Sequence, residues 1–200
     1  MQDAKQQVIA RIYGHGRGWA FSAKDFLDVA NRGVIDKTLS NLQRNGTIRR
    51  ACRGVYDYPR VSKSLNMQSP PDIDQVAHAI ARKKGWRIQA AESWAANLLG
   101  LTTQVPARIV YLTDGKRSSV QLENGTIEFR PTALKNLDTG KPGLVIQALR
   151  GIGRENIDGR IITYLRKQLS DTDCRRLLDK TEATSWIYEI IKKICYMDKA

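Results

Sequence analysis

Apolar residues recur at helical spacing near the start of the chain. Val8, Ile9 and Ile12 would share one face of a helix, which predicts a helix over residues 3–13. Two aromatic residues then flank a short apolar run at residues 19–21, which we interpret as a strand. We therefore expect a helix and a short strand before the first polar turn.

A second helix is expected to begin at Ser22, because Ser22 can act as its N-cap with Asp25 in the capping-box position. Residues 31–33 interrupt the apolar pattern, and Gly33 suits a positive φ in a tight turn between two helices. A third helix is predicted from residue 34 to residue 45. This order of helix, turn and helix indicates a helix-turn-helix motif.

The helix over residues 34–45 is amphipathic. Ile35, Leu39 and Leu42 fall on one face and should pack inward. The opposite face carries side chains able to bind phosphates or the edges of bases. These outward residues, with one arginine at the start of the helix, are Arg32, Lys37, Ser40, Asn41 and Arg44.

Two short strands are predicted after this helix, at residues 47–50 and 55–58, joined by a tight turn. The hairpin is basic, since it carries Arg49, Arg50 and Arg53. A basic hairpin beside such a helix is placed to bind backbone phosphates or to enter the minor groove. We interpret the segment as a winged helix-turn-helix; the alternative is an ordinary small α/β domain whose basic face is merely solvated.

Proline and serine residues at 61–71 indicate a linker. The expected division is therefore a DNA-binding domain over residues 1–60, a linker over 61–71 and a C-terminal domain over 72–200. In that last domain the patterns predict helices and an antiparallel sheet with Asp-Gly and Asn-Gly turns. The expected helices are 73–84, 91–99, 142–149, 157–169, 171–178 and 183–195, and the expected strands are 86–89, 108–113, 118–122 and 126–130.

The predicted fold class is thus α+β: an N-terminal winged helix-turn-helix, then a small antiparallel-sheet α/β domain with a helical C-terminal region. Composition adds a partner to this picture. The chain of 200 residues has a formal net charge of +13 and a pI near 9.9. Residues 1–69 hold 12 Lys and Arg against 5 Asp and Glu. This excess of positive charge favours a polyanion as the binding partner, and nucleic acid is the leading candidate.

The three cysteines, Cys52, Cys174 and Cys195, have neither disulfide nor zinc spacing, so we expect no disulfide framework and no metal. The first eleven residues lack an apolar signal core, and no apolar run is long enough to cross a bilayer. We therefore expect a cytoplasmic protein that does not bind membranes.

A catalytic site is not expected. The strongest candidate is a metal-dependent nuclease in which Asp114 and Glu128 would hold a divalent cation, with Arg130 in the place of the usual lysine. Arginine stays protonated and is a poor base. The alternative is that Asp114 caps a turn and that Glu128 and Arg130 lie on a solvated strand face.

Several motifs together resemble a known family. The winged part of the chain resembles the N-terminal domain of AbiEi-type antitoxins in three runs: Thr38-Leu39-Ser40-Asn41-Leu42, Asn45-Gly46-Thr47-Ile48 and Arg53-Gly54-Val55-Tyr56. A second block is similar to a subgroup of that family: Gly85-Trp86-Arg87-Ile88, Ala95-Ala96-Asn97-Leu98-Leu99-Gly100-Leu101, Gln104-Val105-Pro106-Ala107, Tyr111-Leu112-Thr113-Asp114-Gly115 and Thr126-Ile127-Glu128-Phe129-Arg130. The similarity covers roughly residues 5–135.

The resemblance implies a bacterial toxin–antitoxin operon related to phage abortive infection. Its antitoxin represses its own promoter and opposes a nucleotidyltransferase-like toxin without a stable complex between them. We therefore expect a non-enzymatic, sequence-specific DNA-binding repressor that needs no cofactor and binds double-stranded DNA. The other hypotheses are the nuclease using Asp114 and Glu128, and an RNA-binding or scaffold protein.

Overall fold

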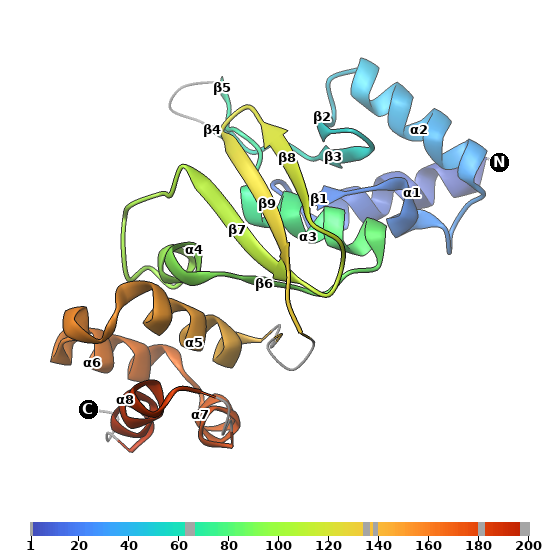
Figure 1. Cartoon of the computed structure of the whole chain (residues 1–200). Coiled ribbons are helices and arrows are strands. Elements are labelled where there is room, and N and C mark those ends of the chain that lie inside the picture. Colours follow the sequence, from blue (N-terminus) through green and yellow to red (C-terminus); the bar gives the residue numbers. More distant parts are fainter. Residues whose placement is uncertain (1, 63–66, 134–136, 138–139, 180–182, 197–200) are drawn as a thin grey trace. The chain divides into compact units, whose positions relative to one another are not determined.

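The structure is a computed structural model that describes residues 2–62, 67–133, 137, 140–179 and 183–196 (Figure 1). It contains helices and small sheets, which confirms the expected α+β class. The chain divides into two compact units. We call residues 1–87 with 119–127 the N-terminal unit, and residues 88–118 with 128–200 the C-terminal unit.

The N-terminal unit begins with a helix, a strand and a single 3₁₀ turn, and a second helix and two hairpins follow. Its sheet has the strand order β1-β3-β2 with antiparallel pairs, and β4 pairs with β5. The elements are α1 (Gln2–His15), β1 (Ala20–Phe21), η1 (Ala23–Phe26), α2 (Arg32–Arg44), β2 (Arg49–Cys52), β3 (Val55–Asp57), β4 (Val61–Ser62), β5 (Met67–Gln68) and α3 (Ile73–Lys84).

The core of this unit lies between α1, η1 and α2. Phe21 and Phe26 meet edge to face with their ring centroids 5.5 Å apart. Ile12 from α1 and Ile35 and Leu39 from α2 close around them, all at most 1% exposed. The predicted inward face of α2 is confirmed, since Leu42 also packs against this cluster.

The expected helix after Ser22 is only one 3₁₀ turn. The capping box between Ser22 and Asp25 is present, but Leu27 is 51% exposed, so the apolar face ends after one turn. Asn31 then caps α2 by accepting a hydrogen bond from the backbone N–H of Val34. The expectation that Gly33 forms the turn is wrong, because α2 already begins at Arg32.

Residues 61–71 do not form a simple linker. They contain the strands β4 and β5, and the helix α3 that follows packs within the N-terminal unit. Arg82 of α3 binds Asp25 with Nε and Oδ1 2.7 Å apart and donates a second bond, of 2.8 Å, to the carbonyl oxygen of Ala20. The contacts therefore place the division after Arg87 and not within residues 61–71.

The C-terminal unit combines strands with a group of helices. The elements that follow α3 along the chain are β6 (Ile88–Ala90), α4 (Glu92–Leu98), β7 (Arg108–Thr113), β8 (Ser118–Leu122), β9 (Gly125–Pro131), α5 (Lys141–Ile152), η3 (Arg154–Asn156), α6 (Gly159–Gln168), α7 (Asp171–Leu178) and α8 (Ser185–Cys195). The strand order is β6-β7-β9-β8, and β6 runs antiparallel to β7. Residues 119–127 of the β8–β9 hairpin are grouped with the N-terminal unit.

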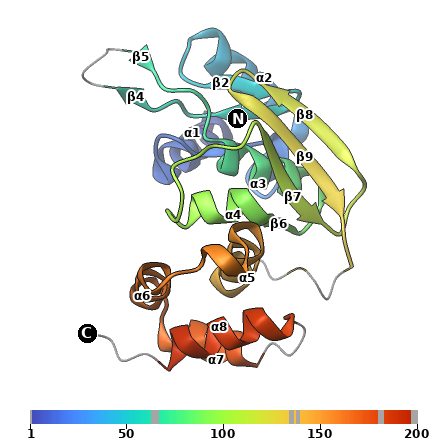
Figure 2. The ribbon, with the colours of Figure 1, turned by 60° about the vertical axis from the view of Figure 1, so that its left-hand side comes forward.

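The buried residues of the C-terminal unit lie in its sheet and in its helices. Tyr111 is fully buried and accepts a hydrogen bond of 2.7 Å from Nε1 of Trp94. In the helical part, α7 and α8 lie side by side below α5 (Figure 2). Ile187, Ile191 and Ile194 of α8 are fully buried, so this face of the helix is part of the core.

Within the described parts of the chain, no helix combines the length and the apolar character that a bilayer crossing needs.

Candidate nucleic-acid interface

Four of the predicted residues share the outer face of α2. Lys37, Ser40 and Arg44 are exposed, and Asn41 is partly exposed. They lie opposite Ile35 and Leu39, which are buried. The helix thus presents two cations and two hydrogen-bonding side chains to solvent on a rigid support. Such a surface can bind phosphates and can donate to or accept from base edges.

Arg32 lies at the first position of α2 and forms an ion pair one turn along the helix. Its Nε is 2.8–2.9 Å from both carboxylate oxygens of Asp36, and both side chains are exposed. This pair contributes little to stability, because exposed ion pairs are screened by water. Arg32 therefore remains available at the start of the helix.

The β2–β3 hairpin carries the three predicted arginines, but only two of them face solvent. Arg50 and Arg53 are exposed. Arg49 is not available as expected, because its guanidinium group binds inside the unit. Its Nε and one terminal nitrogen lie 3.0 and 2.7 Å from the oxygens of Asp57, which is 2% exposed, and the same nitrogen donates to the carbonyl oxygen of Ser69. Arg49 is therefore a structural residue in this unit.

The last turn of α3 adds basic residues beside the hairpin. Lys83 Nζ donates a hydrogen bond of 2.8 Å to the carbonyl oxygen of Arg53. Lys84 Nζ lies 4.0 Å from the centre of the Trp86 ring, and burial, followed by the neighbouring Lys83, lowers the pKa of Lys84. The sequence prediction missed these lysines because it assigned α3 to the next domain. The sequence does carry a sign of them, because three basic residues at 82–84 directly precede Gly85, a glycine that is typical of a helix C-terminus.

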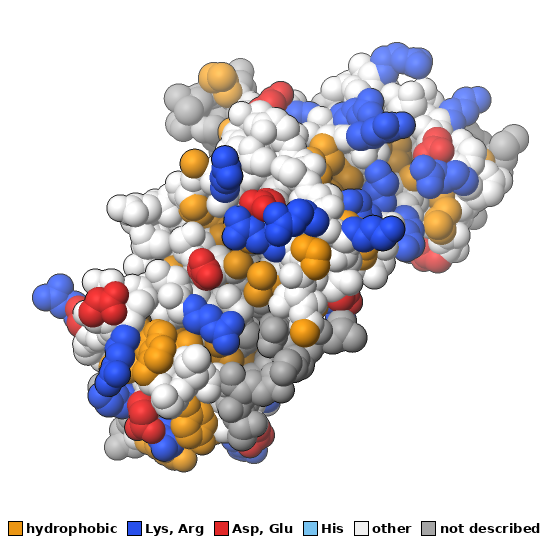
Figure 3. Space-filling model, viewed as in Figure 1, with side chains coloured by type: hydrophobic (Ala, Val, Ile, Leu, Met, Phe, Trp, Pro, Cys, Tyr) orange, Lys and Arg blue, Asp and Glu red, His pale blue; other side chains and the backbone are white. Residues whose placement is uncertain are grey.

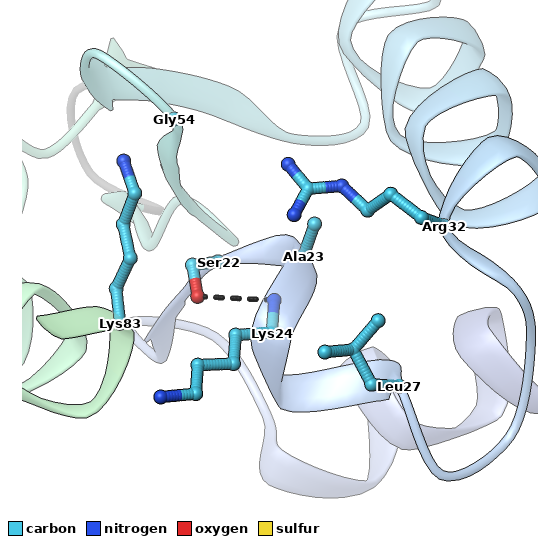
Figure 4. A pocket seen from close by; sticks show the side chains of 7 residues that line it. All are labelled: Ser22, Ala23, Lys24, Leu27, Arg32, Gly54 and Lys83. Carbon is cyan, nitrogen blue, oxygen red and sulfur yellow. Dashed lines mark hydrogen bonds between the residues drawn. The ribbon is translucent and has the colours of Figure 1, made fainter. Parts of the chain in front are cut away.

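An open pocket lies where η1, the start of α2, the tip of the β2–β3 hairpin and the end of α3 meet (Figure 4). Its volume is about 330 Å³. Ser22 forms part of its wall, and its Oγ accepts a hydrogen bond of 3.3 Å from the backbone N–H of Lys24. The pocket is lined by Ser22, Ala23, Lys24, Leu27, Arg32, Gly54 and Lys83.

Basic side chains gather over this part of the N-terminal unit. Figure 3 shows Lys and Arg side chains over α2, the β2–β3 hairpin and the adjoining end of α3. The exposed basic residues of these elements are Arg32, Lys37, Arg44, Arg50, Arg53, Arg82, Lys83 and Lys84. A surface of this charge attracts polyanions by releasing condensed counterions.

The nuclease candidates are arranged differently from a metal site. Both carboxylate oxygens of Glu128 bind Arg130, at 3.1 and 3.0 Å, and this pairing holds the pKa of Glu128 below its usual value. Asp114 is exposed after the end of β7. Among the described residues, no group of three or more His, Cys, Asp or Glu side chains could hold a metal ion. Glu128 and Arg130 thus form an ion pair at the surface of β9.

Residues 7–177 match the profile of a protein family described as a family of unknown function (DUF6088). A comparison with curated proteins found no match. The matched range spans the basic surface of the N-terminal unit and much of the C-terminal unit.

Proposed function

The chain belongs to the DUF6088 family of unknown function, and we propose that it is a sequence-specific DNA-binding repressor whose N-terminal unit is a winged helix-turn-helix. Three features support the motif: η1 in the position of the first helix, α2 as the recognition helix and the β2–β3 hairpin as the wing. The proposed wing is short, with Arg53 and Gly54 forming its turn.

The outer face of α2 is the observation that carries this proposal. Its lysine and arginine can bind phosphates on either side of a major groove, while Ser40 and Asn41 can address base edges between them. An asparagine can bind adenine with two hydrogen bonds, which discriminates between sequences. The exposed Arg50 and Arg53 would bind backbone phosphates or enter the neighbouring minor groove from the wing.

The regulatory role that we propose follows from the resemblance to AbiEi-type antitoxins. The protein would bind the promoter of its own operon and oppose a nucleotidyltransferase-like toxin, with no stable complex between the two proteins required. No catalytic group is assigned in this proposal, since the chemistry of the α2 surface is that of binding. The pairing of Glu128 with Arg130 leaves the nuclease hypothesis without a specific supporting observation.

The experiment that tests the proposal is fluorescence anisotropy with a labelled duplex taken from just upstream of the gene. A scrambled duplex and an RNA duplex of the same sequence serve as comparisons, across a salt series. We expect tighter binding to the upstream duplex and a steep salt dependence. Binding to RNA should be weak, because the narrow major groove of A-form RNA excludes a recognition helix. Equal weak binding to all three would refute the proposal.

Two variants separate the reading of sequence from the binding of phosphates. Asn41→Ala should reduce the preference for the upstream duplex over the scrambled one, whereas Arg53→Ala should weaken both and flatten the salt dependence. Gln43→Ala is the matched control, because Gln43 is exposed on the same helix but lies outside the predicted contact set. Equal loss on both duplexes with Asn41→Ala would contradict its role in reading bases.

A further inference from the structure

The pocket at the end of α3 is lined by basic and small or apolar side chains. Its three basic residues come from three elements: Lys24 from η1, Arg32 from α2 and Lys83 from α3. None of the described residues that line it is acidic. Three positive charges around one hollow repel each other, and a bound anion would relieve that repulsion.

The three cations are placed differently around the pocket: in Figure 4 the Arg32 guanidinium group points into it, whereas the Lys83 ammonium group points toward Gly54 and the Lys24 ammonium group lies at the rim, away from Arg32. Lys83 is bonded to a carbonyl oxygen, which does not neutralise its charge. Arg32 pairs with Asp36 through Nε, while its two terminal nitrogens point into the pocket in Figure 4. A guanidinium group in this position can still donate two hydrogen bonds to phosphate oxygens.

The tip of the hairpin is shaped around the lysine of α3. Gly54 has φ +70°, a backbone conformation that favours glycine. A Cβ atom at this position would lie 2.6 Å from Lys83 Nζ. Glycine at the turn thus leaves room for the Lys83 ammonium group, which lies beside the hairpin at the rim of the pocket.

We propose that this pocket holds a backbone phosphate of bound duplex DNA, which makes the last turn of α3 part of the DNA-binding surface. The proposal rests on the DNA-binding function proposed above and adds contacts from Lys24 of η1 and Lys83 of α3, which lie outside both the recognition helix and the wing. Lys24, Arg32 and Lys83 donate to the phosphate oxygens, and the apolar side chains of Ala23 and Leu27 contact the adjoining deoxyribose.

Two single variants test the pocket: Lys83→Gln and Lys24→Gln. The second variant is needed because Lys83 also holds the hairpin, whereas Lys24 lies on η1. Lys193→Gln on α8 is the matched control, since it removes the same charge from an exposed position outside the N-terminal unit. Each variant is measured with the upstream and the scrambled duplex across the salt series, and its thermal unfolding is recorded.

We expect each pocket variant to weaken both duplexes by about eightfold at 0.1 M salt, because the counterion term for one phosphate follows roughly the 0.9 power of salt concentration. The salt slope should fall by about 0.9, and the preference for the upstream duplex should persist. Lys193→Gln should leave both quantities at their wild-type values. A change with Lys83→Gln but none with Lys24→Gln would assign the effect to the hairpin and overturn the pocket proposal.

The remaining outcomes separate this inference from the proposed function. If wild-type protein prefers the upstream duplex and neither pocket variant changes binding, DNA recognition stands and the phosphate pocket is refuted. If wild-type protein binds neither duplex, both proposals are refuted. Titration with inorganic pyrophosphate, followed by calorimetry, tests a free phosphate as the source. Tight pyrophosphate binding that Lys24→Gln abolishes, without any effect on duplex binding, would overturn the assignment to DNA.

Discussion

Replacing Arg49 with alanine should destabilise the protein and leave its direct contacts with DNA intact. The Arg49 guanidinium group makes two hydrogen bonds to the Asp57 carboxylate, at 3.0 and 2.7 Å, and a third, of 3.0 Å, to the carbonyl oxygen of Ser69. Asp57 is only 2% exposed. Loss of the arginine would leave a buried carboxylate without this partner and the Ser69 carbonyl group with one bond fewer.

The size of the effect follows from burial. Breaking a buried ion pair by removing one partner costs about 3–5 kcal/mol. The Arg49 side chain is 22% exposed, so water can hydrate part of the group that loses its partner. We therefore expect the free energy of unfolding to fall by about 3 kcal/mol. If the 200 residues unfold together, this corresponds to a fall in Tm of roughly 6–12 °C. Urea unfolding followed by circular dichroism measures the free energy directly.

Arg50→Ala is the matched control, because Arg50 neighbours Arg49 on β2 but is exposed. It should change the free energy of unfolding by less than about 0.5 kcal/mol and weaken DNA binding. Adding Asp57→Asn to the Arg49→Ala variant should restore part of the lost stability, because it removes the unpaired buried charge. A stable Arg49→Ala protein that binds DNA more weakly than Arg50→Ala would refute this reasoning.

Three further predictions concern the C-terminal unit. Gly151→Ala should lower the free energy of unfolding by about 2 kcal/mol, because a Cβ atom at residue 151 would lie 2.5 Å from the backbone carbonyl carbon of Glu92. Gly159→Ala is the control, because the space around residue 159 is open and the free energy of unfolding should not fall. Cys195 should react slowly with iodoacetamide at pH 8 in the folded protein and rapidly in urea, as followed by mass spectrometry, because burial and the adjacent Cys174 raise its pKa to about 12. The same raised pKa means that its contribution to stability is complete below about pH 9 and is lost as the pH rises toward 12. Supercoiled plasmid incubated with the protein and Mn²⁺ or Mg²⁺ should stay intact on a gel, because Arg130 occupies both carboxylate oxygens of Glu128; metal-dependent nicking would revive the nuclease hypothesis.

Elements with strong local signals were predicted correctly from the sequence. The strands 108–113 and 118–122 and the helices 73–84 and 171–178 have the bounds that their patterns indicated. Each is defined by alternation or helical spacing together with a cap or a turn of known chemistry. The segment after Ser22 failed because its capping box is a local signal for the start of a helix. How far the helix continues depends on apolar contacts that end after one turn.

The role of Arg49 could not be predicted because it depends on a bulge. A regular hairpin with Arg53 and Gly54 in its turn would pair Asp57 with Arg50. The observed register pairs Arg50 with Tyr56 and Arg49 with Asp57, because an irregularity follows Arg50. A shift of one residue exchanges the two faces of a strand. The bulge therefore decides which arginine is buried in an ion pair and which faces solvent, and neither residue type carries that information.

The place of α3 shows why composition alone gave the wrong boundary. Proline and serine at 61–71 are typical of a linker, yet the same residues include β4 and β5. Arg82 binds Asp25 and the Ala20 carbonyl oxygen, contacts that join residues about sixty positions apart and leave no periodic trace in the sequence. These contacts also matter for the proposed function. Because Arg82 fixes the last turn of α3 against the unit, Lys83 is held beside the hairpin, and basic residues that read as part of a second domain become candidates for binding DNA.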